Sequence, residues 1–144
     1  MRVEIIFDPS PVWDHIKEAL CDQGGELIDS GEFLGAFDGD TMAGAFFIRP
    51  LSTYCMDVHG GIHPDYYGKG REICREMIEH LFKTTLCLKI VVFIPAFNRL
   101  ARNSAIKIGF KEEGILTRSF LKYMRLHDQH IYGLTKTEGL SCHQ

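Results

Sequence analysis

The segment with the clearest chemical potential is glycine-rich and covers residues 60–71, which read Gly-Gly-Ile-His-Pro-Asp-Tyr-Tyr-Gly-Lys-Gly-Arg. It follows an apolar run and precedes a helical pattern that continues to about Thr84. A strand, a glycine-rich turn and a helix in this order offer backbone N–H groups and a positive helix end to a phosphate. The segment therefore predicts an anion site; the alternative is that its glycines only permit a tight strand-to-helix turn.

Two titratable side chains, Asp57 and His59, lie just before this segment. They are two residues apart, so on a strand they share one face, and imidazole is suited to proton transfer at neutral pH. They are the candidate acid–base pair, with a hydrogen-bonded structural histidine as the alternative. His59 and His63 predict no shared metal, because four residues along a strand separate them by roughly 13 Å. Cys55 has no identifiable basic partner and is a weak candidate nucleophile.

The net charge of −3 hides an asymmetry along the chain. Residues 1–65 carry 3 Lys/Arg against 12 Asp/Glu, whereas residues 66–144 carry 13 against 7. The basic half holds the glycine-rich segment, and its cations alternate with acids and lack interleaved aromatic residues, so a small anion is favoured over a nucleic acid. The acidic half is either a solvated surface or an attractor for a cationic substrate, through Glu26, Asp29, Glu32, Asp38 and Asp40.

Size and composition predict one domain in a reducing compartment. With 144 residues and 45% hydrophobic content, the chain can bury one sizeable core. The five cysteines have no short paired spacing, so neither a disulfide framework nor a zinc site is predicted. No segment approaches the roughly 20 apolar residues that cross a bilayer, and no targeting segment is recognised. The expectation is a cytoplasmic protein without membrane contact.

The first half of the chain predicts mostly strands. A strand at 2–7 precedes a helix that Ser10 caps and a Gly-Gly pair ends. Strands at 32–37 and 42–48 flank an Asp-Gly hairpin turn. A further strand at 54–62 leads into the glycine-rich segment, and the paired Gly60-Gly61 within it indicates a bulge or a close approach of another backbone or a ligand.

The second half alternates helices with strands. The helix after the glycine-rich segment has an apolar stripe formed by Ile73, Met77, Ile78, Leu81 and Phe82. An apolar strand at 88–94 should pair in parallel with the strand at 54–62. A helix that Asn98 caps and Gly109 ends turns four residues inward, Leu100, Ala101, Ala105 and Ile108. Strands at 110–116 and 127–135 follow, and the polar tail from Lys136 is expected to be loose.

Three further motifs accompany the 62–70 motif: Asn98 with Ala101, the block at 107–114, and Asp128 with Tyr132-Gly133-Leu134. Together with the element order they resemble the GCN5-related N-acetyltransferase (GNAT) superfamily over about residues 54–134. The resemblance implies an α/β (α+β) fold, a mixed and mostly antiparallel twisted sheet of about six to seven strands with a central parallel pair and flanking helices. It also implies one domain at 1–135 and a polar tail at 136–144.

The resemblance further implies acetyl-CoA as co-substrate, no metal, and direct transfer of an acetyl group to a primary amine of a small molecule or a protein. The candidate catalytic residues are His59, Asp57 and Tyr67. Carried over position by position, the pantetheine arm would lie against Gly61 and Ile62. The pyrophosphate and its surroundings would involve Tyr67, Gly68, Lys69, Gly70, Arg71, Asn98 and Arg102.

Three positions depart from the family pattern. Tyr67 and Glu72 occupy the first and last positions of the loop signature, and Ala105 stands where many members have a tyrosine that protonates the leaving thiolate. Tyr66, Tyr67 and Tyr132 are the phenols that could replace it. The enzyme is the leading hypothesis, and these departures motivate an alternative, a catalytically inactive GNAT-fold binding or assembly protein such as a phage virion component, whose partner would be another virion or assembly protein. A homodimer remains open under either reading.

Overall fold

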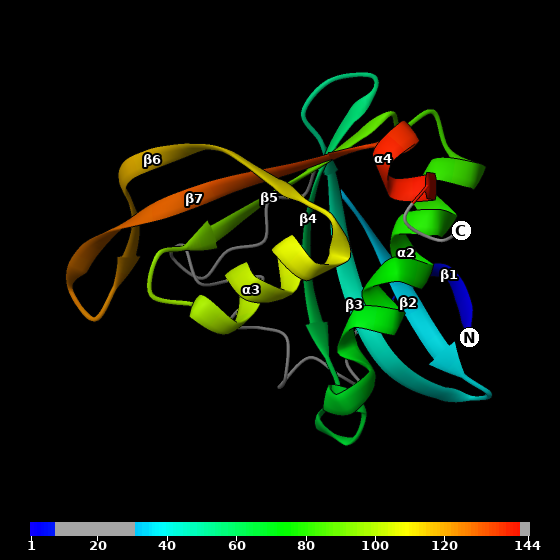
Figure 1. The fold of residues 1–144 in the computed structure, drawn as a ribbon. Coiled ribbons are helices and arrows are strands. Elements are labelled where there is room, and N and C mark those ends of the chain that lie inside the picture. Colours follow the sequence, from blue (N-terminus) through cyan, green and yellow to red (C-terminus); the bar gives the residue numbers. More distant parts are fainter. Residues whose placement is uncertain (8–30, 142–144) are drawn as a thin grey trace.

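The structure, a computed structural model, describes residues 1–7 and 31–141. At its centre is one seven-stranded sheet with the order β1-β2-β3-β4-β5-β7-β6 (Figure 1). The strands are β1 (Arg2–Ile6), β2 (Glu32–Asp38), β3 (Thr41–Pro50), β4 (Cys55–Ile62), β5 (Lys89–Pro95), β6 (Lys111–Lys122) and β7 (Arg125–Thr135). The helices are the 3₁₀ helix η1 (Pro64–Lys69), α2 (Gly70–Thr84), α3 (Arg99–Ile108) and α4 (Lys136–Ser141).

Neighbouring strands of this sheet are antiparallel except β4 and β5, which are parallel. The predicted mixed sheet with a central parallel pair is therefore confirmed. The predicted helix that begins at Ser10 lies outside the described residues, as do Glu26 and Asp29. In the described ranges no helix combines the length and the apolar character that crossing a membrane requires.

Strands β1 to β4 form a meander whose turns follow local sequence signals. The predicted Asp-Gly turn joins β2 to β3, and Gly39 has a φ of 61°, a conformation that glycine adopts readily. The predicted bulge at Gly60-Gly61 is wrong, because the β3–β4 register runs without a shift from Gly44 to Pro50. The close approach is instead made by the ring of Phe46, since a Cβ at Gly60 would lie 2.3 Å from it.

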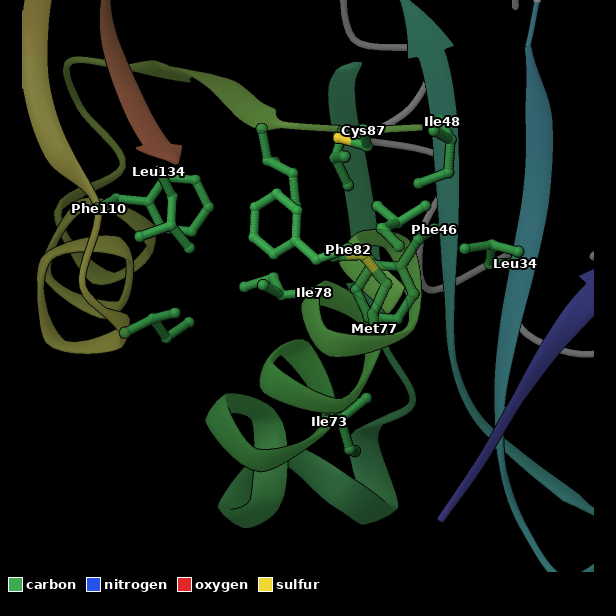
Figure 2. Packing of buried hydrophobic residues seen from close by; sticks show 14 of the residues in the cluster. Leu34, Phe46, Ile48, Ile73, Met77, Ile78, Phe82, Cys87, Phe110 and Leu134 are labelled. Atoms are coloured by element: carbon green, nitrogen blue, oxygen red, sulfur yellow. The ribbon is translucent and has the colours of Figure 1, made fainter. Parts of the chain in front are cut away.

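The core lies between one face of the sheet and the helices α2 and α3. All five residues of the predicted α2 stripe are buried, and they pack against sheet residues such as Phe46 and Leu134 (Figure 2). Helix α3 adds Ala105 and Ile108 to the same cluster. Leu100, predicted to point inward, is 81% exposed, because only the C-terminal half of this ten-residue helix is buried against the core.

The hairpin of β6 and β7 is longer than predicted. Its two-residue turn consists of Tyr123 and Met124, with φ values of 51° and 60°. Such turns normally carry Asn or Gly at these positions, so the sequence lacks the usual hairpin signal. The predicted strands consequently end too early, at 116, and begin too late, at 127.

The tail beyond Thr135 was expected to be loose, and this is wrong for residues 136–141, which form α4. Glu138 accepts hydrogen bonds from the backbone N–H and the hydroxyl of Thr135, while the N–H of Glu138 donates to that hydroxyl. This reciprocal cap starts the helix. Gly139 then allows close packing on α2, since a Cβ there would lie 2.5 Å from the Phe82 ring.

Glu138 also ties α4 to β6 through an ion pair with Lys111, whose Nζ lies 2.6 Å from Oε2. Hydrogen bonds from Lys111 and then Thr135 lower the pKa of Glu138 from 4.5 to about 2. Because the pKa of Glu138 is lower in the folded chain than in the unfolded chain, its ionisation stabilises the fold at pH values above about 4.5. This contribution disappears as the pH falls from about 4.5 to 2.

We expect Glu138→Gln to flatten the pH dependence of the unfolding free energy between about pH 4.5 and 2, measured by urea denaturation. The exposed Glu76→Gln is the control, and an unchanged dependence in Glu138→Gln would contradict this role.

Candidate active site

The sheet opens between its two parallel strands. β4 and β5 are paired only over Cys55–Asp57 and Lys89–Val91. Beyond Asp57, β4 continues beside β3 as far as Ile62, whereas β5 continues beside β7 as far as Pro95. The two strands therefore diverge, and Figure 1 shows β4 and β5 running in different directions from the centre of the sheet. The opening is positioned by the sheet itself.

The backbone groups of β4 alternate between its two neighbours with a period of two residues. The N–H of His63 donates to the carbonyl of Ala43 at 2.8 Å, so odd-numbered residues of β4 are turned toward β3. The carbonyl of Tyr54 accepts from the N–H of Leu88 at 2.8 Å, so even-numbered residues are turned toward β5. The N–H of Val58 closes the last bridge of the short ladder, between Asp57 and Val91, and the even-numbered backbone groups beyond it have no β5 partner.

These unpaired backbone groups are the carbonyl of Val58 and the N–H and carbonyl groups of Gly60 and Ile62. They form an edge inside the sheet to which an extended, amide-containing ligand can hydrogen-bond as an added strand does. The sequence prediction for this edge named Gly61 and Ile62. Ile62 lies on the edge, whereas the backbone of Gly61 is turned toward β3. Gly60 and Val58 were missed, although a period of two counted along the strand could have found them once its register was known.

The glycine-rich segment is helical throughout, not an open turn. The 3₁₀ helix η1 passes directly into α2, and Gly70 has helical φ and ψ of −56° and −41° with its N–H bonded to the carbonyl of Tyr67. The described glycines with positive φ are Gly39 and Gly109. Backbone conformation therefore does not require glycine at 68 or 70, which removes the tight-turn explanation for both.

Packing does not require glycine at these positions either. A Cβ at Gly68 would meet nothing within 4 Å, and one at Gly70 would meet only a side-chain carbon of Ile62 at 3.8 Å, within the described part of the chain. Among the described residues, the absent side chains leave open space at the start of the 15-residue helix α2. Lys69 and Arg71 are exposed beside it, as is Glu72. Exposed cations beside a helix start are features that an anion site uses, Glu72 lies at the border, and phosphate binding here remains a prediction.

Asn98 and Arg102, the two predicted cofactor-binding residues after β5, already have hydrogen-bond partners within the chain. The Asn98 side-chain oxygen accepts from the N–H of Ala101 at 3.1 Å and so caps α3, as predicted. Arg102 donates from Nε to the hydroxyl of Tyr132 at 3.2 Å and from Nη1 to the carbonyl of Ala96 at 2.9 Å. Both residues organise the start of α3, and a cofactor contact from either remains a prediction.

The candidate phenols have different surroundings. Tyr132 is 1% exposed within the core, where its hydroxyl accepts from Arg102. Tyr67 is exposed on η1. The hydroxyl of Tyr66 donates to Asp38 at 3.1 Å. Desolvation raises the pKa of Tyr66, and the Asp38 carboxylate raises it further by a smaller amount. Ala105, where the resemblance noted in the sequence would place a tyrosine, is buried in the core. Tyr66 and Tyr67 are therefore the phenols that a ligand on η1 could reach.

The predicted acid–base pair is brought together on β4. Asp57 is completely buried, and its Oδ2 accepts from Nε2 of His59 at 3.0 Å. The same oxygen accepts from Nη2 of Arg49 at 2.5 Å, on the neighbouring strand β3. Its Oδ1 is buried without a hydrogen-bond partner in the described structure. Arg49 was missed, because its place opposite Asp57 depends on the register of two strands.

The pair lies on the face of the sheet that is turned away from the α2 core. Val58, between the two residues, belongs to the core, so the pleat directs Asp57 and His59 to the opposite face. Asp57 is the last β4 residue in the parallel ladder, and the next residue on its face is His59, beside the opening. The His59 side chain is 21% exposed, so one part of the ring meets solvent.

The hydrogen bond to Asp57 determines which nitrogen of His59 can react. A carboxylate can only accept, so Nε2 carries the proton that it donates. In the neutral ring the other nitrogen, Nδ1, then holds the lone pair. Nδ1 has no partner among the residues that the structure describes. The arrangement therefore presents a proton acceptor at the opening between β4 and β5.

The described cysteines are poor nucleophiles. Burial raises the pKa of Cys55 and of Cys87, and it raises the pKa of Cys74 to about 11. The Cys87 thiol also donates to the carbonyl of Lys89 at 3.3 Å. Because the thiolate is the reactive form, these environments disfavour thiol chemistry near neutral pH.

A scan against protein-family models and a search of curated proteins each gave no match. Solved structures do match. A single-residue mutant of the spermidine N-acetyltransferase SpeG from Vibrio cholerae superposes with a TM-score of 0.82 at 14% identity, over 100% of both chains. A chimera of SpeG from Vibrio cholerae and hSSAT gives 0.79 at 16% identity, over 98% of this chain and 99% of that one. A putative acetyltransferase from Acinetobacter baylyi gives 0.72 at 18% identity, over 93% and 92%. At these identities the likeness establishes the fold.

Proposed function

We propose, from the GNAT fold that this chain has, that it is an N-acetyltransferase that moves an acetyl group from acetyl-CoA directly to a primary amine. The observation that carries the proposal is the opening between β4 and β5. The strand β4 borders this opening with an unpaired backbone edge, and the start of α2 follows β4 and η1. The proton acceptor His59 lies beside the opening, on the face of the sheet turned away from the α2 core.

The residues present fit acetyl-CoA part by part. Its pantetheine arm contains amides, which match the unpaired edge formed by the Val58 carbonyl and the backbone of Gly60 and Ile62. Its pyrophosphate matches the start of α2, where Gly68 and Gly70 expose the surface and Lys69 with Arg71 supplies positive charge. Glu72 is exposed and can turn to solvent. Together these groups support binding of the thioester in the opening.

In the proposed reaction, the side chains of this protein transfer protons from the amine and to the leaving thiolate. After its ammonium form has lost one proton to solvent, the amine nitrogen attacks the thioester carbonyl carbon, so that a C–N bond forms and the C–S bond breaks. The proton lost by the amine passes to Nδ1 of His59, while Asp57 holds the ring by its Nε2–H. The leaving thiolate is only moderately basic, and a phenol of η1, Tyr66 or Tyr67, can return a proton to it. General-base help of this kind is worth about 10²–10⁴-fold.

For the acceptor we propose a small aliphatic amine that is cationic in water. Two of the three solved structures described above are named as spermidine N-acetyltransferases, and spermidine is an aliphatic polyamine. In this chain, Glu32, Asp38 and Asp40 are exposed around the β2–β3 hairpin and favour the approach of a cation. A protein amine would meet the same charge.

The deciding experiment is calorimetric titration of acetyl-CoA into the purified protein, followed by detection of released thiol with a panel of primary amines. We expect saturable binding and thiol release that depends on the amine. Tertiary amines, which cannot form a stable amide, are the control and should release none. No detectable binding at millimolar acetyl-CoA would refute the enzyme. Binding without release for any amine would favour the alternative, an inactive binding or assembly protein.

A further inference from the structure

Arg49 makes a contact that the proposed chemistry does not use. It lies on β3 opposite Asp57, and its guanidinium donates to the same carboxylate oxygen, Oδ2, that His59 contacts. The Arg49 side chain is 29% exposed, whereas that of Asp57 is fully buried. We propose that Arg49 is a positioning residue that acts through Asp57 and keeps the His59 ring able to accept a proton. The inference rests on the proposed function in taking His59 as the base.

The reason is charge balance around a buried carboxylate. A carboxylate removed from water requires a nearby positive charge. Arg49 supplies one permanently, because a guanidinium is always protonated in proteins. If His59 had to supply it, both ring nitrogens would carry protons and neither could accept another. With Arg49 in place, Asp57 can orient a neutral imidazole instead of drawing a proton onto it.

Other groups around the pair do not provide this balance. On β3, the residue opposite His59 is Phe47, and on β5 the residue opposite Asp57 is Val91; both are apolar. On the same face of β4 lies the thiol of Cys55, whose pKa is raised by burial. Lys89, opposite Cys55, is paired with Glu113 of β6 at 2.7 Å. Among the described residues, Arg49 is thus the cation in contact with Asp57 besides His59 itself.

The test is a pH titration of the His59 ring by long-range ¹H–¹⁵N NMR, which reports both the tautomer and the protonation midpoint. Subtracting the spectrum of His59→Gln identifies the signals. In the natural chain we expect the Nε2–H tautomer in the neutral ring. In Arg49→Met the midpoint should rise by about one pH unit or more, because the unbalanced carboxylate favours the protonated ring. Arg49→Lys keeps the charge and should stay near the natural midpoint.

A second pair of variants shows whether Arg49 acts through Asp57. In an Asp57→Asn background, Arg49→Met should raise the His59 midpoint much less, because only the direct repulsion between the guanidinium and the protonated ring is then lost. An unmoved midpoint in Arg49→Met, or an equal rise in both backgrounds, would overturn the proposal. If Arg49→Met does not fold, Arg49→Gln can still donate to Oδ2 without a charge and tests the same effect.

The NMR titration needs neither acetyl-CoA nor catalysis, so the two proposals can fail separately. A protein that transfers no acetyl group but shows the Arg49 effect refutes the proposed function and retains the charge balance. An active enzyme whose His59 does not respond to Arg49→Met overturns only this inference. In an active enzyme, Arg49→Met should also lower kcat near neutral pH with KM for acetyl-CoA unchanged, and kcat should recover at higher pH.

Discussion

Replacing His59 by glutamine is expected to lower kcat for acetyl transfer by about 10²–10⁴-fold while acetyl-CoA still binds. Glutamine keeps an N–H donor for Asp57 but has no group that accepts a proton at neutral pH. The side chain lies on the face opposite the core, so the fold should persist. Steady-state thiol release measures kcat, and calorimetry measures the affinity for acetyl-CoA.

The matched control is His80→Gln. His80 lies on α2 and is partly exposed, outside the opening between β4 and β5. We expect natural kcat and affinity for this variant. If His59→Gln retains full kcat, the histidine has only the structural role that its hydrogen bond to Asp57 also permits, and the base is another group.

Replacing Gly70 by glutamate is expected to weaken acetyl-CoA binding by about tenfold or more, equivalent to about 1.4 kcal/mol or more. The carboxylate would occupy the uncovered start of α2, where the pyrophosphate is proposed to lie, and would repel it. Gly70→Ala should bind better than Gly70→Glu, because the backbone there is helical and a Cβ meets nothing closer than 3.8 Å. Calorimetry and the rise in melting temperature with added acetyl-CoA provide two independent readings.

Gly114→Glu on β6 adds the same carboxylate elsewhere and is the control. A Cβ at Gly114 meets only Ile131, at 3.9 Å, and the residue does not have a positive φ. Both glutamate variants should melt near the natural protein without ligand, and only Gly70→Glu should lose the ligand-induced rise. Equal binding by the two would show that the start of α2 is not the phosphate site.

The parts of the fold that the sequence predicts correctly depend on short-range patterns. The α2 stripe follows the helical repeat, and the turn at Gly39 follows a two-residue signal. The errors arise where a tertiary contact overrides such a signal. Tyr123 and Met124 occupy a turn that the flanking strands impose, and α4 forms because Glu138 can cap it and Gly139 fits beneath Phe82.

The residues of the candidate site also fall into those that local spacing predicts and those that depend on a tertiary contact. Asp57 and His59 share a face because of the strand repeat alone, and their hydrogen bond agrees with that prediction. Arg49 lies eight residues from Asp57 in sequence and meets it only through the β3–β4 register. The same register decides that Gly60, and not Gly61, is turned toward the opening. For Gly68 and Gly70, the sequence left two explanations, an anion site and a tight turn, and the φ values in the structure exclude the tight turn.

The short ladder between β4 and β5 also bears on how readily the folded chain opens. Among residues 1–7 and 31–141, three residue pairs join β1–β4 to β5–β7–β6, so this part of the sheet is least joined where the ligand is proposed to bind. A ligand that binds only the folded chain raises its stability by mass action, by about 2.7 kcal/mol at one hundred times Kd. Under the proposed function, a fall in acetyl-CoA concentration would therefore make the chain more susceptible to proteolysis. The rate of protease digestion with and without acetyl-CoA would measure this change in susceptibility.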